Sequence, residues 1–400
     1  MAKRKICMIV HQYPPDAGAT AYRMDFRAKF LQSQGFDVDI FAPGYKNETQ
    51  IESSGIRLHR VAAVASSGST DMDYTRLNKA GRMRLPVFLH PLAGFLRWLP
   101  PLVSHLRRFE ADDTILYTYN NPVSLHLAAL AVRKRFKAWV CEFRDPIAGY
   151  EYSHRGFLGH ISDAWLEKQV LRHASIICMR EGIQAGPDDY CSAKGEVVLL
   201  PDYGVDLDLF TGFEQLSSNF GQPLGIYAGT VFNDISFEPL SSALDLYQRS
   251  NGKAVIRLFG PEHREHLTYD NLNYCGNISF KALLDEYRKA HFLIIYDESE
   301  SESSRTAGFF PSKLAELMAA RRPVLFIGNS GSQTAKIIAD RSLGVCTTND
   351  ATAISESIDK IMTGLNEHQF DLSMNDDKRK LIDASVPESA FVKMLSDITG

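Results

Sequence analysis

Short runs of apolar and β-branched residues alternate along this chain with longer segments of helical spacing, and this alternation limits what the chain can fold into. Runs with little polar interruption are typical of strands in parallel sheets, because crossover helices bury both faces of such a sheet. The pattern therefore predicts an α/β protein with doubly wound parallel sheets.

The alternation occurs in two series, which predict two domains. The first series predicts strands at 5–10, 38–41, 56–61, 114–117, 138–142, 175–179 and 196–200. After a lapse over 201–218, the second predicts strands at 224–228, 254–259, 271–275, 292–296, 323–327 and 344–347. We place an N-terminal domain at 1–205 and a C-terminal domain at 206–385. Two such sheets that face each other form a cleft at the carboxyl ends of their strands, which suits an enzyme with two substrates.

Composition argues against several classes of protein. The net charge of -4 gives no sign of a nucleic-acid-binding protein. The six cysteines form no C-x-x-C pair, so neither a zinc site nor a disulfide framework is indicated, and a reducing cytoplasm fits best. The apolar run at the N-terminus ends at Val10, which is too short for a signal peptide.

Two strand-to-helix loops contain small residues that let a ligand approach the backbone. The first, HQYPPDAGATAYRMDF, begins at His11 and includes Gly18, Ala19 and Thr20. A matching loop with Gly229 and Thr230 opens the second series. Helix N-termini at such loops favour anions or hydroxyl groups. Neither loop contains the G-x-G-x-x-G dinucleotide fingerprint, and an ordinary βα loop is the alternative interpretation.

The stretch GFFPSKLAELMAARRPVL, residues 308–325, predicts a helix that begins near Ser312, a residue that can cap it. Lys313 and Glu316 then share one face of its first turn, after a predicted strand and its loop. At the carboxyl edge of a parallel sheet, a lysine can hold phosphate and a carboxylate can accept hydrogen bonds from two ribose hydroxyls. The structural alternative is a surface ion pair.

Several segments have the order and about the spacing found in bacterial family 4 glycosyltransferases. They are YPPDAGATAYR, FRDPIAG, VVLLPDYGVDLDLF, LGIYAGT, IRLFGP, YCGNISFKALLDEYRKAHFLIIY and FFPSKLAELMAARRPVL. The chain resembles this family over nearly its whole length, and most of all the branch that extends lipid-linked oligosaccharides for O-antigen, capsule or exopolysaccharide. The string P-S-K-x-x-E-x-M-A-x-x-x-P-V is its most distinctive element.

This resemblance implies a GT-B fold and a retaining transfer of sugar from a nucleotide donor, UDP- or GDP-linked, without a cofactor or a bound metal. It implies that Glu316 holds the ribose of the donor. The glutamate that usually contacts the transferred sugar would fall at Gly308, so this chain departs from the family there. Lys313, together with Arg305, would neutralise the diphosphate leaving group. The segment 386–400 resembles the C-terminal helix that crosses back to the N-terminal domain in GT-B enzymes.

The segment FRDP places Asp145 and Arg144 just after a predicted strand of the first series. By resemblance Asp145 lies close to the acceptor, where a carboxylate can bind or deprotonate a hydroxyl group. Arg144 would support Asp145 or meet an acceptor phosphate, and His11 is a second candidate contact to the acceptor. An internal ion pair between Arg144 and Asp145 is the alternative.

A basic and apolar segment from Tyr74 to Phe109 suggests a surface for anionic lipid. Exposed aromatic residues, among them Trp98, would lie there beside cations, which suits acidic headgroups. The segment has seven basic residues and no acid: Arg76, Lys79, Arg82, Arg84, Arg97, Arg107 and Arg108. A helix pair that covers the sheet is the alternative.

A glycosyltransferase that acts on a carbohydrate or lipid-linked acceptor, in the cytoplasm or on the inner face of the membrane, is the leading interpretation. Two others stay open, namely a non-catalytic nucleotide-sugar-binding protein and a GT-B nucleotide-sugar epimerase.

Overall fold

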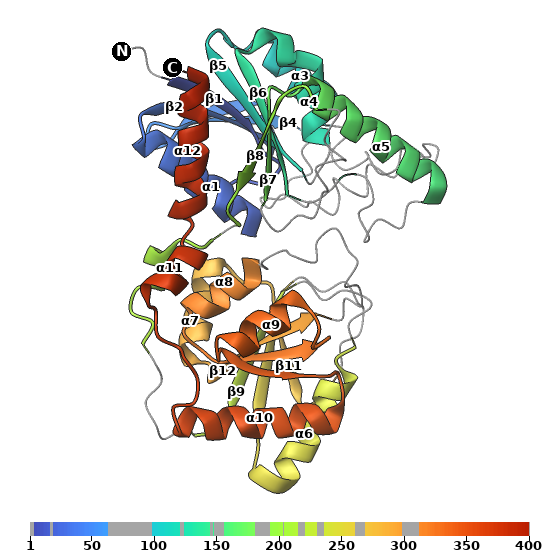
Figure 1. Ribbon diagram of the computed structural model, residues 1–400, viewed down its shortest axis with the longest axis vertical. Coiled ribbons are helices and arrows are strands. Elements are labelled where there is room, and N and C mark those ends of the chain that lie inside the picture. The colour runs from blue at the N-terminus through green and yellow to red at the C-terminus, as the bar shows by residue number, and fades with distance from the viewer. Residues whose placement is uncertain are drawn as a thin grey trace. The chain divides into compact units, whose positions relative to one another are not determined.

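The chain forms two compact α/β units, each built on one sheet (Figure 1). The computed structural model describes residues 4–16, 19–62, 98–120, 124–144, 147, 156–180, 193–202, 204–214, 221–229, 236–260, 269–297 and 312–399. Unit 1 contains the described residues up to Asp202 and those from Ser385 onward, and unit 2 contains the described residues between them.

Unit 1 has an eight-stranded sheet in the order β3-β4-β2-β1-β5-β6-β7-β8. Its strands are β1 (Arg4–Ile9), β2 (Phe36–Gly44), β3 (Glu48–Ile51), β4 (Arg57–Ala62), β5 (Thr114–Tyr119), β6 (Ala138–Phe143), β7 (Ile176–Arg180) and β8 (Glu196–Leu200). Every strand predicted for the first series is present. The chain departs from β1 in both directions, first to β2 and later to β5, as a doubly wound sheet requires.

The sheet of unit 1 has one edge strand, β3, that was not predicted. Strand β3 pairs antiparallel with β4 at one edge. The sequence gives no apolar signal for β3, because its four residues ETQI are solvated rather than buried and Ile51 is 73% exposed. An antiparallel edge strand of this kind is common on sheets that are otherwise parallel.

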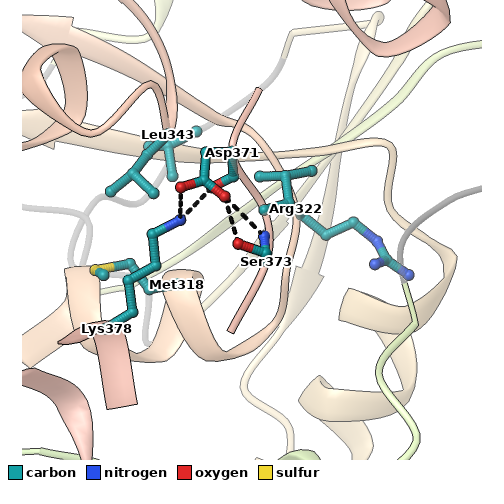
Figure 2. Close-up of a pocket in the computed structure, with 8 residues that line it drawn as sticks. Met318, Arg322, Leu343, Asp371, Ser373 and Lys378 are labelled. Carbon is teal, nitrogen blue, oxygen red and sulfur yellow. Dashed lines mark hydrogen bonds and ion pairs between the residues drawn. The ribbon is translucent and has the colours of Figure 1, made fainter. Parts of the chain in front are cut away.

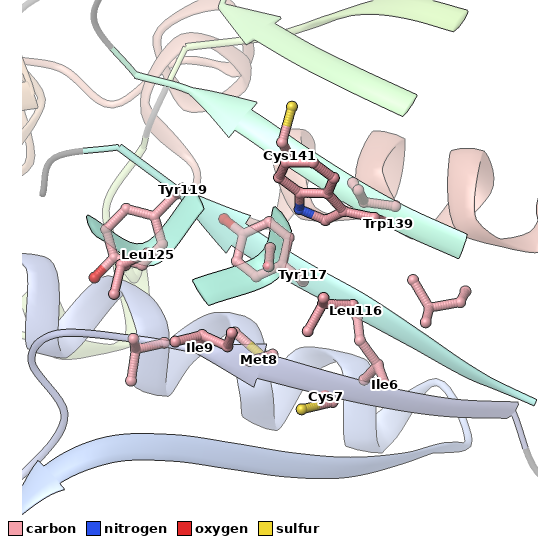
Figure 3. Packing of buried hydrophobic residues seen from close by; sticks show 14 of the residues in the cluster. Ile6, Cys7, Met8, Ile9, Leu116, Tyr117, Tyr119, Leu125, Trp139 and Cys141 are labelled. Atoms are coloured by element: carbon pink, nitrogen blue, oxygen red, sulfur yellow. The ribbon is translucent and has the colours of Figure 1, made fainter. Parts of the chain in front are cut away.

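Helices cover both faces of the sheet in unit 1. They are α1 (Ala19–Ser33), α3 (Leu99–Arg108), α4 (Ser124–Val132), α5 (Gly156–His173) and α12 (Ser385–Thr399). Helices α1 and α12 contact each other, and α4 contacts both α3 and α5. Because right-handed crossovers to the left and right of β1 fall on opposite faces, α1 and α4 lie on opposite sides. Figure 3 shows side chains of β1, β5 and β6 packed in the core between them.

The part of the basic segment that the structure describes, residues 98–109, contributes to the core of unit 1. Trp98, predicted to be exposed to lipid, is only 1% exposed. Prolines in the first turn begin α3 directly after it, and Leu102 and Leu106 on the inner face of that helix are buried. The apolar residues of this part therefore cover the sheet, as in the alternative interpretation, whereas Arg107 and Arg108 are exposed. Residues 74–97 of the segment lie outside the described residues.

Unit 2 has a six-stranded parallel sheet in the order β11-β10-β9-β12-β13-β14. Its strands are β9 (Leu224–Ala228), β10 (Val255–Phe259), β11 (Leu272–Gly276), β12 (Phe292–Asp297), β13 (Val324–Gly328) and β14 (Gly344–Thr347). Its helices are α6 (Glu238–Asn251), α7 (Phe280–Lys289), α8 (Ser312–Ala319), α9 (Gln333–Asp340), α10 (Ala351–Asn366) and α11 (Asp376–Ile382). The prediction of two doubly wound α/β domains is therefore confirmed.

The period-2 alternation of the strands divides the core of unit 2 into two halves. Leu293 and Ile295 of β12 face the half that α7, α8 and α9 cover. Phe292 and Ile294 face the other half, which α6 and α10 cover. Since both faces of the strand are buried, its sequence is apolar at successive positions, which is the signal that made it predictable.

Four buried charges join α12 to the rest of unit 1. Arg27 of α1 donates to Glu388 of α12 at 2.7–3.0 Å and contacts Glu142 of β6 at 2.5 Å. Arg180 of β7 contacts the other oxygen of Glu142, also at 2.5 Å. The Tyr117 hydroxyl donates to Glu142 at 2.7 Å. All five side chains are almost fully buried, so each charge depends on its partners for the solvation that water would otherwise provide.

We expect Glu388→Gln to lower the free energy of unfolding by about 3–5 kcal/mol, because it leaves the buried Arg27 guanidinium without its carboxylate partner on α12. Chemical denaturation measures the change. Asp397→Asn is a matched control, since Asp397 is exposed on the same helix. Its effect should stay below about 0.5 kcal/mol. Equal effects of the two substitutions would contradict the structural role of Glu388.

Candidate functional site

The topology places one candidate site in each unit, at the point where the strand order reverses. In unit 1 this point lies between β1 and β5, and in unit 2 it lies between β9 and β12. Doubly wound sheets bind ligands outside the carboxyl ends of the strands at such points.

Polar residues that follow neighbouring strands come together at the reversal point of unit 1. His11 follows β1, Tyr119 ends β5, and Arg144 follows β6. The Tyr119 hydroxyl lies 2.7 Å from Nδ1 of His11. Arg144 donates to Oγ1 of Thr20 at 3.3 Å, and its guanidinium lies 5.7 Å from the centre of the Tyr119 ring. The structure thus brings together three of the residues predicted for the acceptor site: His11, Thr20 and Arg144.

Burial, and to a smaller extent the positive charge of Arg144, together lower the pKa of His11 from 6.5 to about 3. The imidazole is therefore neutral at physiological pH. It can donate or accept a hydrogen bond there, whereas Arg144 provides the positive charge of the site. Because the folded-state pKa lies below the unfolded value, the stability from the neutral ring is present above about pH 6.5 and is lost as the pH falls toward 3.

Two buried side chains that the sequence did not single out hold the loop that follows β6. Asn120, 1% exposed, accepts a hydrogen bond from the backbone N–H of Arg144 at 2.6 Å. Glu167 of α5, 7% exposed, accepts one from the N–H of Ile147 at 2.9 Å. Both contacts depend on tertiary structure, so no local sequence pattern indicates them.

We expect Arg144→Gln to raise the pKa of His11, because it removes the nearby positive charge, while burial still keeps the pKa below 6.5. An NMR titration of the histidine side chains measures this pKa, with His11→Asn to assign the signal. Arg108→Gln, an exposed arginine at the end of α3, should leave the pKa unchanged. A His11 ring that titrates near pH 6.5 in the unmodified protein would contradict the described environment.

At the reversal point of unit 2, the backbone turns after β9 and β10 approach closely. The N–H of Gly229 donates to the carbonyl of Phe259 at 2.9 Å. Gly260 has a φ of +141°, and a Cβ atom there would overlap the carbonyl oxygen of Gly229. Glycine is therefore required at this contact, which keeps the predicted loop residue Gly229 at the end of its strand.

Lys313 and Glu316 share the first turn of α8, as predicted, and interact with each other. Nζ of Lys313 lies 3.1 Å from Oε2 of Glu316 and donates to the buried Tyr287 hydroxyl of α7 at 3.0 Å. The two side chains are only 30% and 13% exposed, so this is not a fully solvated ion pair. Burial lowers the pKa of Lys313, but the charge of Glu316 and the Tyr287 hydroxyl outweigh burial and raise it above its ordinary value. Lys313 is therefore charged at any physiological pH.

Not all of the predicted site residues are among those that the structure describes. Gly18, Asp145, Thr230, Arg305 and Gly308 lie outside the described residues. Ala19 and Ser312 begin α1 and α8, but their side chains are not described. Within the described ranges there is no group of three or more His, Cys, Asp or Glu side chains that could hold a metal ion. A reaction without a metal or cofactor stays a prediction.

A pocket in unit 2 lies at the opposite edge of the sheet, beside the amino ends of β13 and β14 (Figure 2). Lys378 of α11 reaches into it and contacts the carboxylate of Asp371 at 2.8 Å. The hydroxyl of Ser373 donates to the same carboxylate at 2.6 Å. Since these groups satisfy one another and lie far from the carboxyl ends of the strands, we assign this pocket a structural role.

Comparison with known proteins gives a match for the first unit. Residues 18–179 match a glycosyl transferase 4-like domain. The match spans less than half of the chain. A comparison with curated proteins finds no match.

Solved structures with the same fold cover nearly the whole chain. Sucrose-phosphate synthase from Thermosynechococcus elongatus has a TM-score of 0.66 at 14% identity, over 99% of both chains. A UDP-forming α,α-trehalose-phosphate synthase from Burkholderia xenovorans has a TM-score of 0.61 at 13% identity, over 100% of both chains. WaaG, a glycosyltransferase involved in lipopolysaccharide biosynthesis, has a TM-score of 0.59 at 14% identity, over 96% of this chain and 98% of that chain. The predicted GT-B fold is therefore confirmed, while identities this low carry no information on substrate.

Proposed function

We propose that the protein is a retaining glycosyltransferase that moves a sugar from a nucleotide donor to a carbohydrate or lipid-linked acceptor in the synthesis of a bacterial surface polysaccharide. The observation that carries the proposal is the half-buried pair of Lys313 and Glu316 on the first turn of α8, beside the reversal point of unit 2. The match of residues 18–179 to a glycosyl transferase 4-like domain supports the same reaction class.

The donor site requires one group for ribose and positive charge for the diphosphate. In this proposal the Glu316 carboxylate accepts hydrogen bonds from two ribose hydroxyls, and the Lys313 ammonium contacts phosphate. As the bond between the sugar and the diphosphate breaks, negative charge builds up on the leaving group, and a fixed cation there lowers the barrier. Arg305 and the backbone near Gly229 and Thr230 complete this site. The donor in this proposal is a UDP- or GDP-linked sugar.

The acceptor binds at the reversal point of unit 1. Arg144 provides a cation for an acceptor phosphate, and neutral His11 provides a hydrogen bond without a change in charge. Gly18, Ala19 and Thr20 allow close approach to the start of α1. Asp145 is the proposed base that takes the proton of the acceptor hydroxyl as the new bond forms. Asn120 and Glu167 fix the backbone on both sides of Asp145.

A lipid-linked acceptor would bring the enzyme to the inner face of the cytoplasmic membrane. The basic residues of the segment 74–109 would contact anionic headgroups, each with about 1 kcal/mol. Within the described part of the chain, no helix is long and apolar enough to span a bilayer.

We expect Glu316→Gln to weaken the binding of a nucleotide-sugar donor by about 10- to 100-fold, because the carboxylate is replaced by a poorer acceptor for ribose hydroxyls. Lys313→Met should weaken binding of the diphosphate to a similar extent. Isothermal titration with UDP- and GDP-sugars measures both. The pair Asp285 and Arg288 on α7 is a matched control, since it has the same i,i+3 spacing but is more exposed. If Asp285→Asn weakens binding as much as Glu316→Gln, the donor-site assignment is wrong.

We also expect the transferred sugar to keep the anomeric configuration of the donor. NMR of the product formed from a donor of known configuration measures it. An inverted product contradicts the retaining reaction. Donor binding without turnover would favour the non-catalytic nucleotide-sugar-binding protein, and a donor converted to its epimer without any acceptor would favour the epimerase.

A further inference from the structure

Helix α5 turns its acidic residues inward and its tryptophan outward. Asp163 is 1% exposed and Glu167 is 7% exposed, whereas Ile161 is 51% exposed and Trp165 is 57% exposed. Large apolar side chains this exposed are unusual on a helix that also has a buried apolar face, here formed by Leu166, Val170 and Leu171. The outward apolar residues therefore need an explanation other than the core of unit 1.

The outward face of α5 combines apolar and basic side chains. Ile161, Trp165, Lys168 and Arg172 follow one another at spacings of four, three and four residues, which places them on one face of the helix. Lys168 and Arg172 are exposed. No exposed side chain that the structure describes on α5 is acidic. The face is therefore locally basic in a chain whose net charge is -4.

We propose that this outward face of α5 docks on an anionic lipid bilayer. Tryptophan is enriched at the interface between membrane and water, where its ring lies at the level of the headgroups. Ile161 and Trp165 would enter that region, while Lys168 and Arg172 contact acidic headgroups. A two-fold contact between copies of the chain would bring the same basic side chains near each other, so the charge favours a bilayer over a second copy.

The position of the face within unit 1 agrees with this partner. Because Glu167 contacts the backbone of Ile147, this turn of α5 lies level with the loop that follows β6, at the carboxyl edge of the sheet. The turns that carry Ile161 and Trp165 precede it, and Figure 1 shows α5 reaching past the sheet. A bilayer at this face would be on the same side as the proposed acceptor site, although the docking itself does not depend on that function.

Tryptophan fluorescence reports on this face directly. The chain has three tryptophans, and the other two, Trp98 and Trp139, are each 1% exposed. We expect vesicles that contain phosphatidylglycerol to shift the emission to shorter wavelength and to protect it from a water-soluble quencher. Vesicles of phosphatidylcholine alone should have little effect. Trp165→Phe should remove the signal change while the chain still floats with the vesicles.

Substitutions then test the face by vesicle flotation of the full chain. We expect Ile161→Ser with Trp165→Ser to abolish flotation, and Lys168→Gln with Arg172→Gln to weaken vesicle binding by about 10- to 30-fold. Ile51→Ser is the control, because Ile51 is exposed on β3 and should not contribute. Circular dichroism checks that each variant is folded.

Three results would overturn the proposal. The first is no flotation with anionic vesicles. The second is flotation that does not use the α5 face. Such flotation either leaves Trp165 emission unchanged, or is abolished by Arg82→Gln, Arg84→Gln and Arg97→Gln together and retained by the α5 variants. The third is a shift of Trp165 emission with protein concentration in the absence of lipid, which would assign the face to a second copy of the chain.

Discussion

The architecture of unit 1 depends on four charges buried away from water. Arg27, Glu142, Arg180 and Glu388 form two positive and two negative groups, and each ion contacts an opposite charge. Such a group is tolerated inside a protein only as a complete set, because one unpaired ion would cost several kcal/mol. One member of this set, Glu388, belongs to α12. The buried charges beside α1 are therefore fully paired only when α12 is packed against unit 1. Glu388 therefore completes the core of unit 1, although all of unit 2 separates it from the rest of that unit along the chain.

The two reversal points differ in how their charges are arranged before any ligand binds. In unit 1 His11 is neutral, and the guanidinium of Arg144 lies near the Tyr119 ring. This site therefore offers a cation to an anionic ligand. In unit 2 the cation and the carboxylate already contact each other. A ligand at the proposed donor site would gain affinity only if it presented both an anion for Lys313 and hydroxyl donors for Glu316, since it would have to replace contacts that exist already. Such a site discriminates against ligands that carry only one of these groups.

The predictable part of the fold was the part buried on both faces. Strands such as β12 have apolar side chains at successive positions, and helices begin at residues such as Ser332 and Ser279 that cap them. Strand β3 escaped prediction because its pairing leaves most of its side chains solvated. Trp98 was misassigned because an apolar composition does not tell whether a bilayer or a sheet covers the residue.

In the candidate sites, too, local sequence indicated some residues and gave no sign of their partners from distant elements. Lys313 and Glu316 were found from the start of a helix after a strand, which is local information. Tyr287 contacts Lys313 from 26 residues away along the chain, and Asn120 and Glu167 hold a loop from separate elements. Partners of this kind follow from sheet order and helix packing, and no spacing within one segment indicates them.

The contribution of α12 to unit 1 also has a consequence for how the chain folds during synthesis. All of unit 2 is made between the last strand of unit 1 and α12. Until α12 leaves the ribosome, Arg27 lacks Glu388, and the hydrophobic surface that Phe391 and Leu395 cover is open to water. The first unit therefore cannot complete its core until the second has been synthesised, which departs from the usual order of folding from the N-terminus. Chaperones that bind exposed apolar surface would have most access to unit 1 during that interval.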